Sequence, residues 1–321
     1  MQTFLQHRLL CAAAVAALSG CAALQPMPEV HQLGVTGAGQ ALARVTSDPV
    51  NEYLPAISPD ESTLLFDAVV RDGYKSESVV VGVDPDTGAR RTHFTSSSTL
   101  ALESAWLPDG SSFIYTSNAL GKWALVRSLS KSPNAAVTVI IGGDAAPSVS
   151  RPSIAPDGKR VAFAVMMRNT WTIGVSHMDG SQFTILGEGM QPAWSPDGKK
   201  VAFVRTVGGF NHVFYVDPDT GTNLVQVTNG EYNDEFPAWA PDSSLIVFGS
   251  SRGSQELGGG ARGRNLFAIR SDGNQLTQLT NGDGIASAPC WGKHGWIYFS
   301  SNQAGNFDIW RFKVSGELAA R

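Results

Sequence analysis

The sequence has few cysteines, and the body of the chain holds a single one. Three occur in 321 residues: Cys11 and Cys21 near the N-terminus, and Cys290 far from both. A disulfide needs two cysteines, so none can form within the body of the chain. Cys290 stands where comparable stretches carry Ala or Ser. We therefore interpret it as a small core residue.

Basic charge is also scarce. The formal net charge is -4, with 24 Lys and Arg against 28 Asp and Glu. A protein that binds DNA or RNA usually carries a basic surface to neutralise phosphates. Nucleic acid is therefore not an expected partner.

Common catalytic and metal-binding motifs are missing. The sequence has no Cys-x-x-Cys, no His-Glu-x-x-His and no phosphate-binding loop. Five histidines lie beyond the leader: His31, His93, His177, His212 and His294. Their spacing places them around the fold, whereas a metal site or a triad needs convergence. Gly249–Gly253 matches Gly-x-Ser-x-Gly but enters a hairpin, where the catalytic motif needs a strand-to-helix turn. We expect no catalytic residue, metal or cofactor.

What the sequence does contain is a repeat. Its fullest copy, Pro192 to Gly198, reads Pro-Ala-Trp-Ser-Pro-Asp-Gly. Pro196 presets φ for a turn, Asp197 can close it with a side-chain hydrogen bond, and Gly198 accepts positive φ. Similar stretches begin at Pro55, Ser104, Pro152, Pro192, Pro237 and Pro289. A repeat of about 40–50 residues holds four short strands, which is one propeller blade. The sequence predicts an all-β fold, a six-bladed β-propeller.

The N-terminal strand is expected to close the last blade. Arg44-Val45-Thr46 precedes the first copy as Gln226-Val227-Thr228 precedes the fifth and Gln278-Leu279-Thr280 the sixth. The last blade otherwise has three strands, ending near Val314. Residues 41–46 would therefore supply its outermost strand, which removes a weak seam from the ring.

Residues 1–20 are expected to be a lipoprotein signal peptide. Arg8 supplies a positive flank, and the apolar run from Leu9 to Leu18 is too short to span a bilayer. Leu18-Ser19-Gly20-Cys21 resembles the lipobox of bacterial lipoproteins, which implies lipidation at Cys21; the alternative is an ordinary cleaved signal. Ala22 after the cysteine then implies the outer membrane, facing the periplasm. We expect a tether over 21–40, the propeller over 41–316 and a C-terminal tail over 317–321.

The repeat resembles the WD40-like repeat of TolB-type propellers. The resemblance covers about residues 41–314 and rests on Pro-x-Trp-Ser-Pro-Asp-Gly-x-x-Val-Ala-Phe, followed later by Leu-Thr-Asn-Gly. TolB carries an α/β domain ahead of its propeller, whereas here only the tether intervenes. Propellers of this type serve as binding platforms, as gates on peptidase domains and occasionally as lyases, so the fold does not settle the function.

Polar residues just before strand one of several copies are the candidate site. They are Glu52, Glu103, Arg151, Gln191, Asp234 and Glu235. Strand one of a blade lines the central channel, so these residues are expected at its mouth. Their mostly acidic character predicts a site for a basic peptide or protein segment. The alternative is hydrogen bonding to neighbouring loops, or solvation.

The function expected from the sequence is a monomeric, non-catalytic binding module of the cell envelope. Its partners would be an envelope protein or peptide segment and, through the lipid at Cys21, the membrane. The alternative is a propeller enzyme or sensor acting on polysaccharide, such as a lyase that uses channel carboxylates and an arginine.

Overall fold

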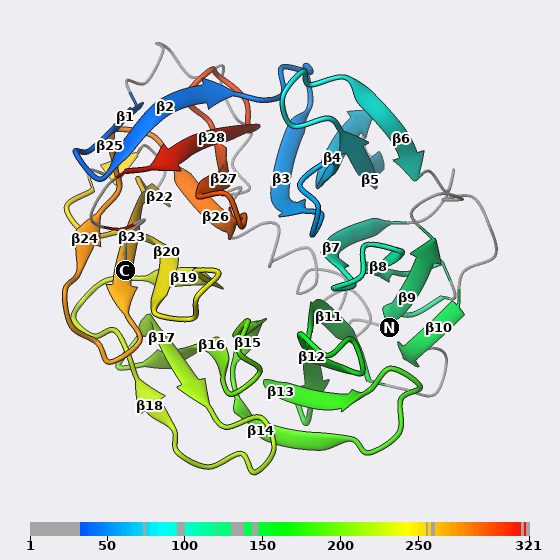
Figure 1. The fold of residues 1–321 in the computed structure, drawn as a ribbon. Coiled ribbons are helices and arrows are strands. Elements are labelled where there is room, and N and C mark those ends of the chain that lie inside the picture. Colours follow the sequence, from blue (N-terminus) through cyan, green and yellow to red (C-terminus); the bar gives the residue numbers. More distant parts are fainter. Residues whose placement is uncertain are drawn as a thin grey trace.

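Six blades surround a central axis. The computed structural model describes residues 33–72, 75–94, 100–119, 121–129, 138–142, 147–254, 256–257, 261–315 and 318. Within them the strands form six four-stranded antiparallel sheets, arranged as blades (Figure 1). The prediction of an all-β, six-bladed propeller is confirmed. The expected signal peptide and Cys21 lie outside the described residues.

The blades follow one another in sequence order. Blade 1 contains β3 (Asn51–Ile57), β4 (Leu64–Asp72), β5 (Lys75–Val83) and β6 (Arg90–Phe94). Blade 2 contains β7 (Ala101–Trp106), β8 (Ser112–Ser117), β9 (Ala124–Leu129) and β10 (Thr138–Gly142). Blade 3 contains β11 (Val149–Ile154), β12 (Arg160–Met167), β13 (Thr170–His177) and β14 (Thr184–Glu188). In each, the first strand lies nearest the axis (Figure 1).

The second half repeats this order. Blade 4 contains β15 (Met190–Trp194), β16 (Val201–Val207), β17 (Phe210–Val216) and β18 (Val225–Gln226). Blade 5 contains β19 (Asp234–Trp239), β20 (Leu245–Ser250), β23 (Asn265–Arg270) and β24 (Thr277–Gln278), with a small hairpin of β21 (Glu256–Leu257) and β22 (Ala261–Arg262) between β20 and β23. Blade 6 contains β26 (Ala286–Trp291), β27 (Trp296–Ser301), β28 (Asp308–Val314) and β2 (Gly39–Arg44).

The turn between strands one and two forms as its sequence predicts. Gly198 has φ of +78°, a region that costs glycine little. The carboxylate of Asp197 accepts the backbone N–H of Lys199 at 3.1 Å. Where the glycine is replaced, Glu61 and Ser243 still adopt positive φ, 56° and 64°. The fold therefore imposes this turn even on copies that lack its best residue.

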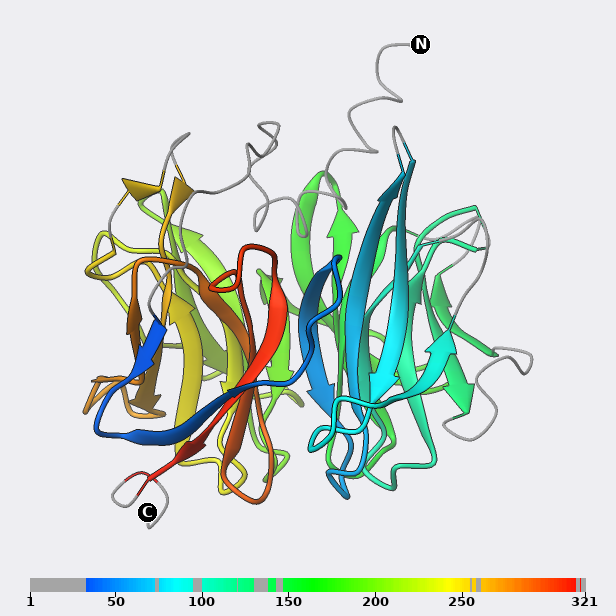
Figure 2. The ribbon, with the colours of Figure 1, turned by 90° about the horizontal axis from the view of Figure 1, so that it is seen from above.

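The N- and C-terminal segments of the propeller share blade 6. β2 pairs antiparallel with β28, with Arg44 opposite Trp310. Figure 2 shows β2 crossing the outside of β28. The prediction that an N-terminal strand closes the last blade is confirmed. Because this pairing joins segments more than 260 residues apart, it ties the ring shut.

Part of the expected tether is structured. Within residues 21–40 the structure describes 33–40, and these include β1 (Leu33–Val35) and the first residues of β2. β1 pairs with β25 (Thr280–Gly282), which lies between blades 5 and 6 in the sequence. Of the expected tail, Leu318 is described; it packs against the hydrophobic cluster that contains Phe312.

Aromatic side chains join neighbouring blades. The indole N–H of Trp106 in blade 2 donates to the carbonyl of Ala56 in blade 1 at 3.0 Å. Trp239 in blade 5 makes the same bond to Ala193 in blade 4 at 2.9 Å. At these two positions the tryptophan of the repeat therefore fills space between adjacent blades.

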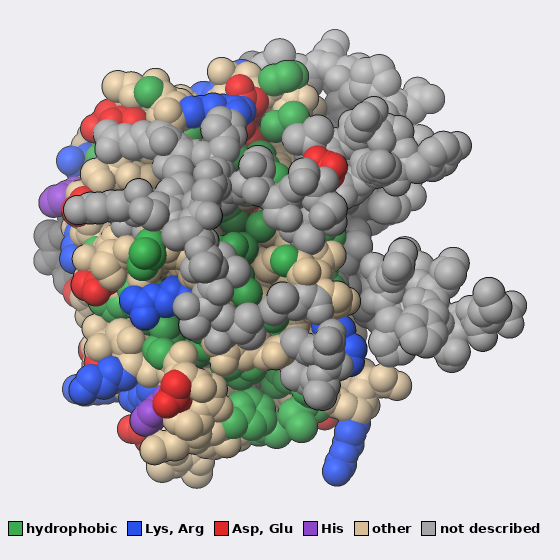
Figure 3. All heavy atoms as spheres, turned by 90° about the vertical axis from the view of Figure 1, so that its right-hand side faces the viewer, with side chains coloured by type: hydrophobic (Ala, Val, Ile, Leu, Met, Phe, Trp, Pro, Cys, Tyr) green, Lys and Arg blue, Asp and Glu red, His purple; other side chains and the backbone are tan. Residues whose placement is uncertain are grey.

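The surface shows no single gathering of basic charge on the side in Figure 3. There, Lys and Arg side chains of the described residues are interspersed with Asp and Glu. Over the described ranges, no helix is long and apolar enough to cross a membrane.

Candidate functional site

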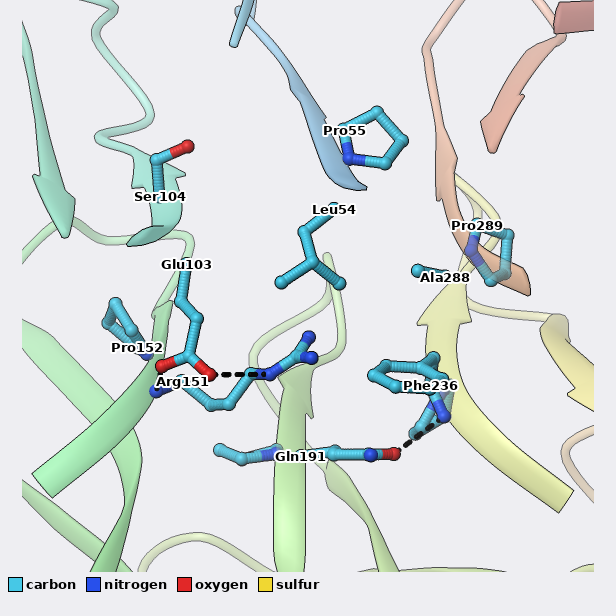
Figure 4. Close-up of a pocket in the computed structure, with 12 residues that line it drawn as sticks. Leu54, Pro55, Glu103, Ser104, Arg151, Pro152, Gln191, Phe236, Ala288 and Pro289 are labelled. Atoms are coloured by element: carbon cyan, nitrogen blue, oxygen red, sulfur yellow. Dashed lines mark hydrogen bonds and ion pairs between the residues drawn. The ribbon is translucent and has the colours of Figure 1, made fainter. Parts of the chain in front are cut away.

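The first strands of the six blades meet around a pocket on the propeller axis. It has a volume of about 110 Å³ (Figure 4). Each first strand contributes two consecutive residues to the lining, which are Leu54–Pro55, Glu103–Ser104, Arg151–Pro152, Gln191–Pro192, Phe236–Pro237 and Ala288–Pro289. We call this the channel pocket. This volume is large enough for the tip of one side chain or for a few ordered waters.

The first residue of every pair has an unusual backbone. Its φ is positive, between +51° and +62°, in all six strands. Pairing with strand two is interrupted at the same point of every first strand by a shift of register. Positive φ is unfavourable for residues other than glycine, and conformations of this kind persist where the surroundings over-determine them. The sixfold recurrence shows that the propeller itself imposes this geometry.

Side chains of the preceding blade hold several of these residues in place. Both carboxylate oxygens of Asp67 accept the backbone N–H of Glu103, at 2.8 and 3.0 Å. Glu103 Oε2 in turn accepts the backbone N–H of Arg151 at 2.8 Å. Gln191 Oε1 accepts that of Phe236 at 2.7 Å. Site residues are thus also ties between blades.

An ion pair occupies one side of the pocket. Arg151 Nε lies 3.1 Å from Glu103 Oε1, and the two side chains are 15% and 2% exposed. The centre of the guanidinium lies 4.6 Å from the ring centroid of Phe236. Thr116 donates its hydroxyl to Glu103 Oε2 at 3.0 Å. Both charges are therefore fixed before any ligand arrives.

Behind this pair lies a buried carboxyl group. Asp67 is almost fully buried, and burial raises its pKa well above the usual range, despite the N–H of Glu103 that it accepts. The neutral form of Asp67 is thereby favoured, so it adds little negative charge to the pocket.

Three of the six predicted site residues line the pocket, and three do not. Glu103, Arg151 and Gln191 line it. Glu52 is fully buried where blade 1 meets blade 6, and accepts the hydroxyl of Thr46. Burial raises the pKa of Glu52 to about 8. All six lie within first strands rather than in the loops before them.

Asp234 and Glu235 are neutralised inside blade 5 and its border with blade 4. Asp234 pairs with Arg252 through both terminal nitrogens, at 2.8 and 2.9 Å. Glu235 pairs with Arg264 at 2.9 Å and accepts the amide of Asn211 at 2.7 Å. For these residues the alternative interpretation holds, namely bonding to neighbouring segments. The pocket is consequently not an acidic mouth.

Sequence reasoning missed the apolar part of the lining. Leu54, Phe236 and Ala288 stand directly before the proline that begins their copy of the repeat. That position is legible in the sequence, because Arg151 and Gln191 occupy it too. Because only polar residues were considered as candidates, the apolar residues at this position before the proline were not recognised.

The Gly-x-Ser-x-Gly match is structural. The serine of the motif, Ser251, is buried, and its hydroxyl accepts the backbone N–H of Asn233 at 2.9 Å. The neighbouring Ser250 is fully buried and donates its hydroxyl to the carboxylate of Asp234 at 2.6 Å. His212 Nδ1 lies 3.9 Å from the same carboxylate, so no hydrogen bond joins them. Among the described residues, no group of three or more His, Cys, Asp or Glu side chains is placed to hold a metal ion.

Solved structures share this architecture. TolB from Acinetobacter baumannii is 16% identical, with a TM-score of 0.57, over 96% of this chain and 68% of that one. An oligogalacturonate lyase from Vibrio parahaemolyticus is 12% identical, with a TM-score of 0.57, over 89% of this chain and 98% of that one. At such identities the likeness shows the fold alone. It confirms the resemblance to TolB-type propellers.

From the fold and the missing motifs, the sequence predicts that this protein is not an enzyme. That prediction is wrong. An oligogalacturonate lyase has the same architecture over nearly its whole length. Function resides in the site and not in the propeller, so the fold gives no ground for excluding catalysis.

Sequence comparison places the protein in a family. An uncharacterized protein of Agrobacterium fabrum is 28% identical over 108 residues, which are 33% of this chain and about a third of that relative's length. The family described as the dipeptidyl peptidase IV (DPP IV) N-terminal region matches residues 145–307, half of the sequence. This range begins just before blade 3 and ends directly before β28, so it includes the first two strands of blade 6. The protein therefore belongs to the dipeptidyl peptidase IV N-terminal region family, with a TolB-like six-bladed propeller.

Proposed function

We propose that this protein is a binding module of the cell envelope that docks a segment of a partner protein in the channel pocket. The observation that carries the proposal is the convergence of all six first strands on one pocket, where a preformed ion pair lies beside Leu54, Phe236 and Ala288. Polar groups that converge in one pocket beside hydrophobic side chains are typical of binding sites.

The N-terminal sequence supports a location at the outer membrane for this module. The leader and the lipobox-like Leu18–Cys21 support a lipid anchor at Cys21 in the outer membrane, facing the periplasm. Cys21→Ser should release the protein from the membrane fraction. A Cys21→Ser protein that still sediments with membranes after a salt wash would refute the anchor.

The docking proposal is tested by blocking the pocket. Leu54 points into it (Figure 4), and Leu54→Trp would fill it. The matched control is Leu276→Trp, which changes an exposed leucine at the outer rim of blade 5. Cross-linked envelopes are used for capture with each protein as bait, read by mass spectrometry.

Docking in the pocket is supported if wild type and Leu276→Trp both recover a partner at near-equal stoichiometry and folded Leu54→Trp does not. Circular dichroism and the melting temperature establish that the variant folds. Undiminished capture by Leu54→Trp would show that the pocket is not the site.

A second candidate is an enzyme or sensor for acidic polysaccharide, favoured by the lyase that shares this fold. Arg151 and Glu103 would then act on, or bind, a uronate unit. Turnover of oligogalacturonate, followed by the ultraviolet absorbance of the unsaturated product, tests the enzyme. Turnover that does not change in Arg151→Gln would refute the role of this site. Stabilisation by the glycan without turnover would indicate a sensor.

A further inference from the structure

The charge at the channel pocket differs from the mouth that the sequence suggests. Among its lining residues Glu103 and Arg151 carry the charges, one of each sign. Glu52, Asp234 and Glu235 are buried elsewhere. A basic segment would therefore find no acidic surface to receive it in this pocket.

Both oxygens of the Glu103 carboxylate are already in contact with neighbouring groups. Oε2 accepts the hydroxyl of Thr116 and the backbone N–H of Arg151, and Oε1 pairs with Arg151 Nε. The side chain is almost completely buried. It holds Arg151 in place rather than offering an acceptor to a ligand.

The guanidinium of Arg151 is held on two sides and unpaired on a third. Glu103 lies at its Nε edge and the ring of Phe236 at one face. Its Nη2 is buried and has no hydrogen-bond partner among the residues that the structure describes. In Figure 4 the terminal nitrogens point toward the middle of the pocket, below Leu54. A buried donor without an acceptor is costly, so an acceptor arriving there would be favoured.

Gln191 adds further donors. Its Oε1 is committed to the backbone N–H of Phe236 at 2.7 Å. A backbone N–H can only donate, so this bond fixes the amide orientation and leaves the Nε2 hydrogens as the free polar group. Around the pocket, then, the side chains of Arg151 and Gln191 offer donors, while the buried carboxylate of Glu103 is occupied by Arg151 and Thr116.

We propose that the channel pocket recognises a carboxylate on the docked protein segment, bound by the terminal nitrogens of Arg151. This inference rests on the proposed function and names the chemistry of the partner. A carboxylate matches the fork of a guanidinium and can accept two parallel hydrogen bonds. Leu54, Ala288 and the prolines form the apolar part of the lining, and the lower local dielectric beside them strengthens the interaction. The carboxylate is either the C-terminus of a polypeptide or an Asp or Glu side chain.

Defined peptides test the proposal by calorimetric titration of the full-length protein. All are N-acetylated sequences of Gly, Ser and Leu. One has a free C-terminus, one is amidated with a single Glu, one is amidated without any charge, and one is amidated with a single Lys. Digalacturonate serves as a non-peptide carboxylate. The first two arms distinguish a polypeptide terminus from an acidic side chain.

Binding of either carboxylate peptide at least about tenfold more tightly than the uncharged peptide is expected, because a hydrogen bond to a charged group contributes about 1.5–3 kcal/mol. Arg151→Gln should remove that preference. Because this substitution leaves Glu103 without its cation, Arg151→Gln with Glu103→Gln provides a second, charge-balanced test. Arg270→Gln, in an exposed pair with Asp272, is the control and should bind as wild type does.

Any of four results would overturn the proposal. The uncharged peptide could bind as tightly as the carboxylate peptides, or the Lys peptide could bind more tightly than they do. Digalacturonate could bind while no peptide does, or nothing could bind. Partner capture separates this failure from failure of the proposed function. Capture that Leu54→Trp abolishes and the charge-balanced double variant retains leaves docking standing and removes the carboxylate. Capture that persists in Leu54→Trp removes the docking itself.

Discussion

At the scale of single residues, the glycines of the repeated turn adopt the positive φ that the turn requires. Gly158 has φ of +68°, and a Cβ placed there would meet Pro108 at an ordinary contact distance of 3.6 Å. Space is therefore available, and the backbone conformation alone disfavours another residue.

Gly158→Ala should therefore lower the free energy of unfolding by about 1 kcal/mol, because alanine must adopt positive φ. Urea unfolding followed by tryptophan fluorescence measures this. The matched control is Gly37→Ala, where no atom lies within 4 Å and φ is not positive. A Gly158→Ala protein as stable as wild type would show that this turn tolerates a side chain without strain.

The buried Glu52 gives a pH dependence of stability. Its pKa is raised from 4.5 to about 8, first by burial, with Asp308 and Asp48 adding repulsion, and against the lowering effect of the Thr46 hydrogen bond and of Arg90. The folded state therefore keeps a proton that the unfolded state releases above pH 4.5. Stability from this group is full below that pH, falls as the pH rises to about 8, and is then constant.

Between pH 5 and pH 8 wild type should lose several kcal/mol of stability relative to Glu52→Gln, on the order of 1.4 kcal/mol per unit of pKa shift over that window. Melting temperatures of both proteins across this range provide the measurement. Glu188→Gln, at an exposed glutamate of β14, is the control and should track wild type. Parallel curves for wild type and Glu52→Gln would refute the raised pKa.

At the scale of elements, the seam between β2 and β28 contains a partly buried ion pair. Arg44 lies 2.8 Å from Asp308, whose side chain is fully buried. Burial raises the pKa of Asp308, and Arg44 opposes that rise. Removing the arginine would leave a buried carboxylate without its cation, which is more costly than losing a surface pair.

Arg44→Met should thus destabilise the protein by about 3 kcal/mol, and adding Asp308→Asn to this variant should recover much of that loss. Chemical unfolding of the single and double variants tests the coupling. Arg270→Met, at an exposed pair, should cost less than about 1 kcal/mol. Additive effects of the two substitutions at the seam would mean that the pair does not stabilise the closure.

At the scale of the whole molecule, stability depends on ring closure. β2 is the outer strand of blade 6 and covers the edge of β28. Without it, blade 6 has three strands and an unpaired edge, which invites association with other molecules. β1 adds a second tie between the N-terminal segment and β25.

Deletion of residues 1–46 should remove a large share of a total stability of about 5–15 kcal/mol, and cause aggregation, whereas deletion of residues 1–32 should leave the melting transition unchanged. Scanning calorimetry and size-exclusion chromatography compare the two truncated proteins. A cooperative, monomeric propeller lacking residues 1–46 would show that closure by β2 is dispensable.

The fold could be predicted because its signal is local and repeated. Each of the five Pro-Asp turns determines its own conformation through Asp and a residue at positive φ. With the sixth copy, which lacks the Pro-Asp pair, they recur about every 40–50 residues and specify six blades. Even the long-range closure was legible, since Arg44-Val45-Thr46 matches segments that precede other copies. The pairing of β1 with β25 has no counterpart in the repeat and could not be anticipated.

The site was only partly predictable, because whether a charged residue faces a ligand depends on partners from other blades. Glu103 and Asp234 look alike in the sequence, each in a first strand. Arg252 neutralises Asp234 inside the fold, whereas Glu103 holds Arg151 in the pocket.

The sequence by itself determined the number of blades, their strand order and the closing strand, because turn chemistry and periodicity act over a few residues and recur. Tertiary structure alone decided which of the charged residues face the axis, how both carboxylate oxygens of Glu103 are engaged and how Arg151 is left with an unpaired donor. These outcomes depend on side chains brought together from separate blades, and on burial, which selects among charges that are equivalent in an extended polypeptide.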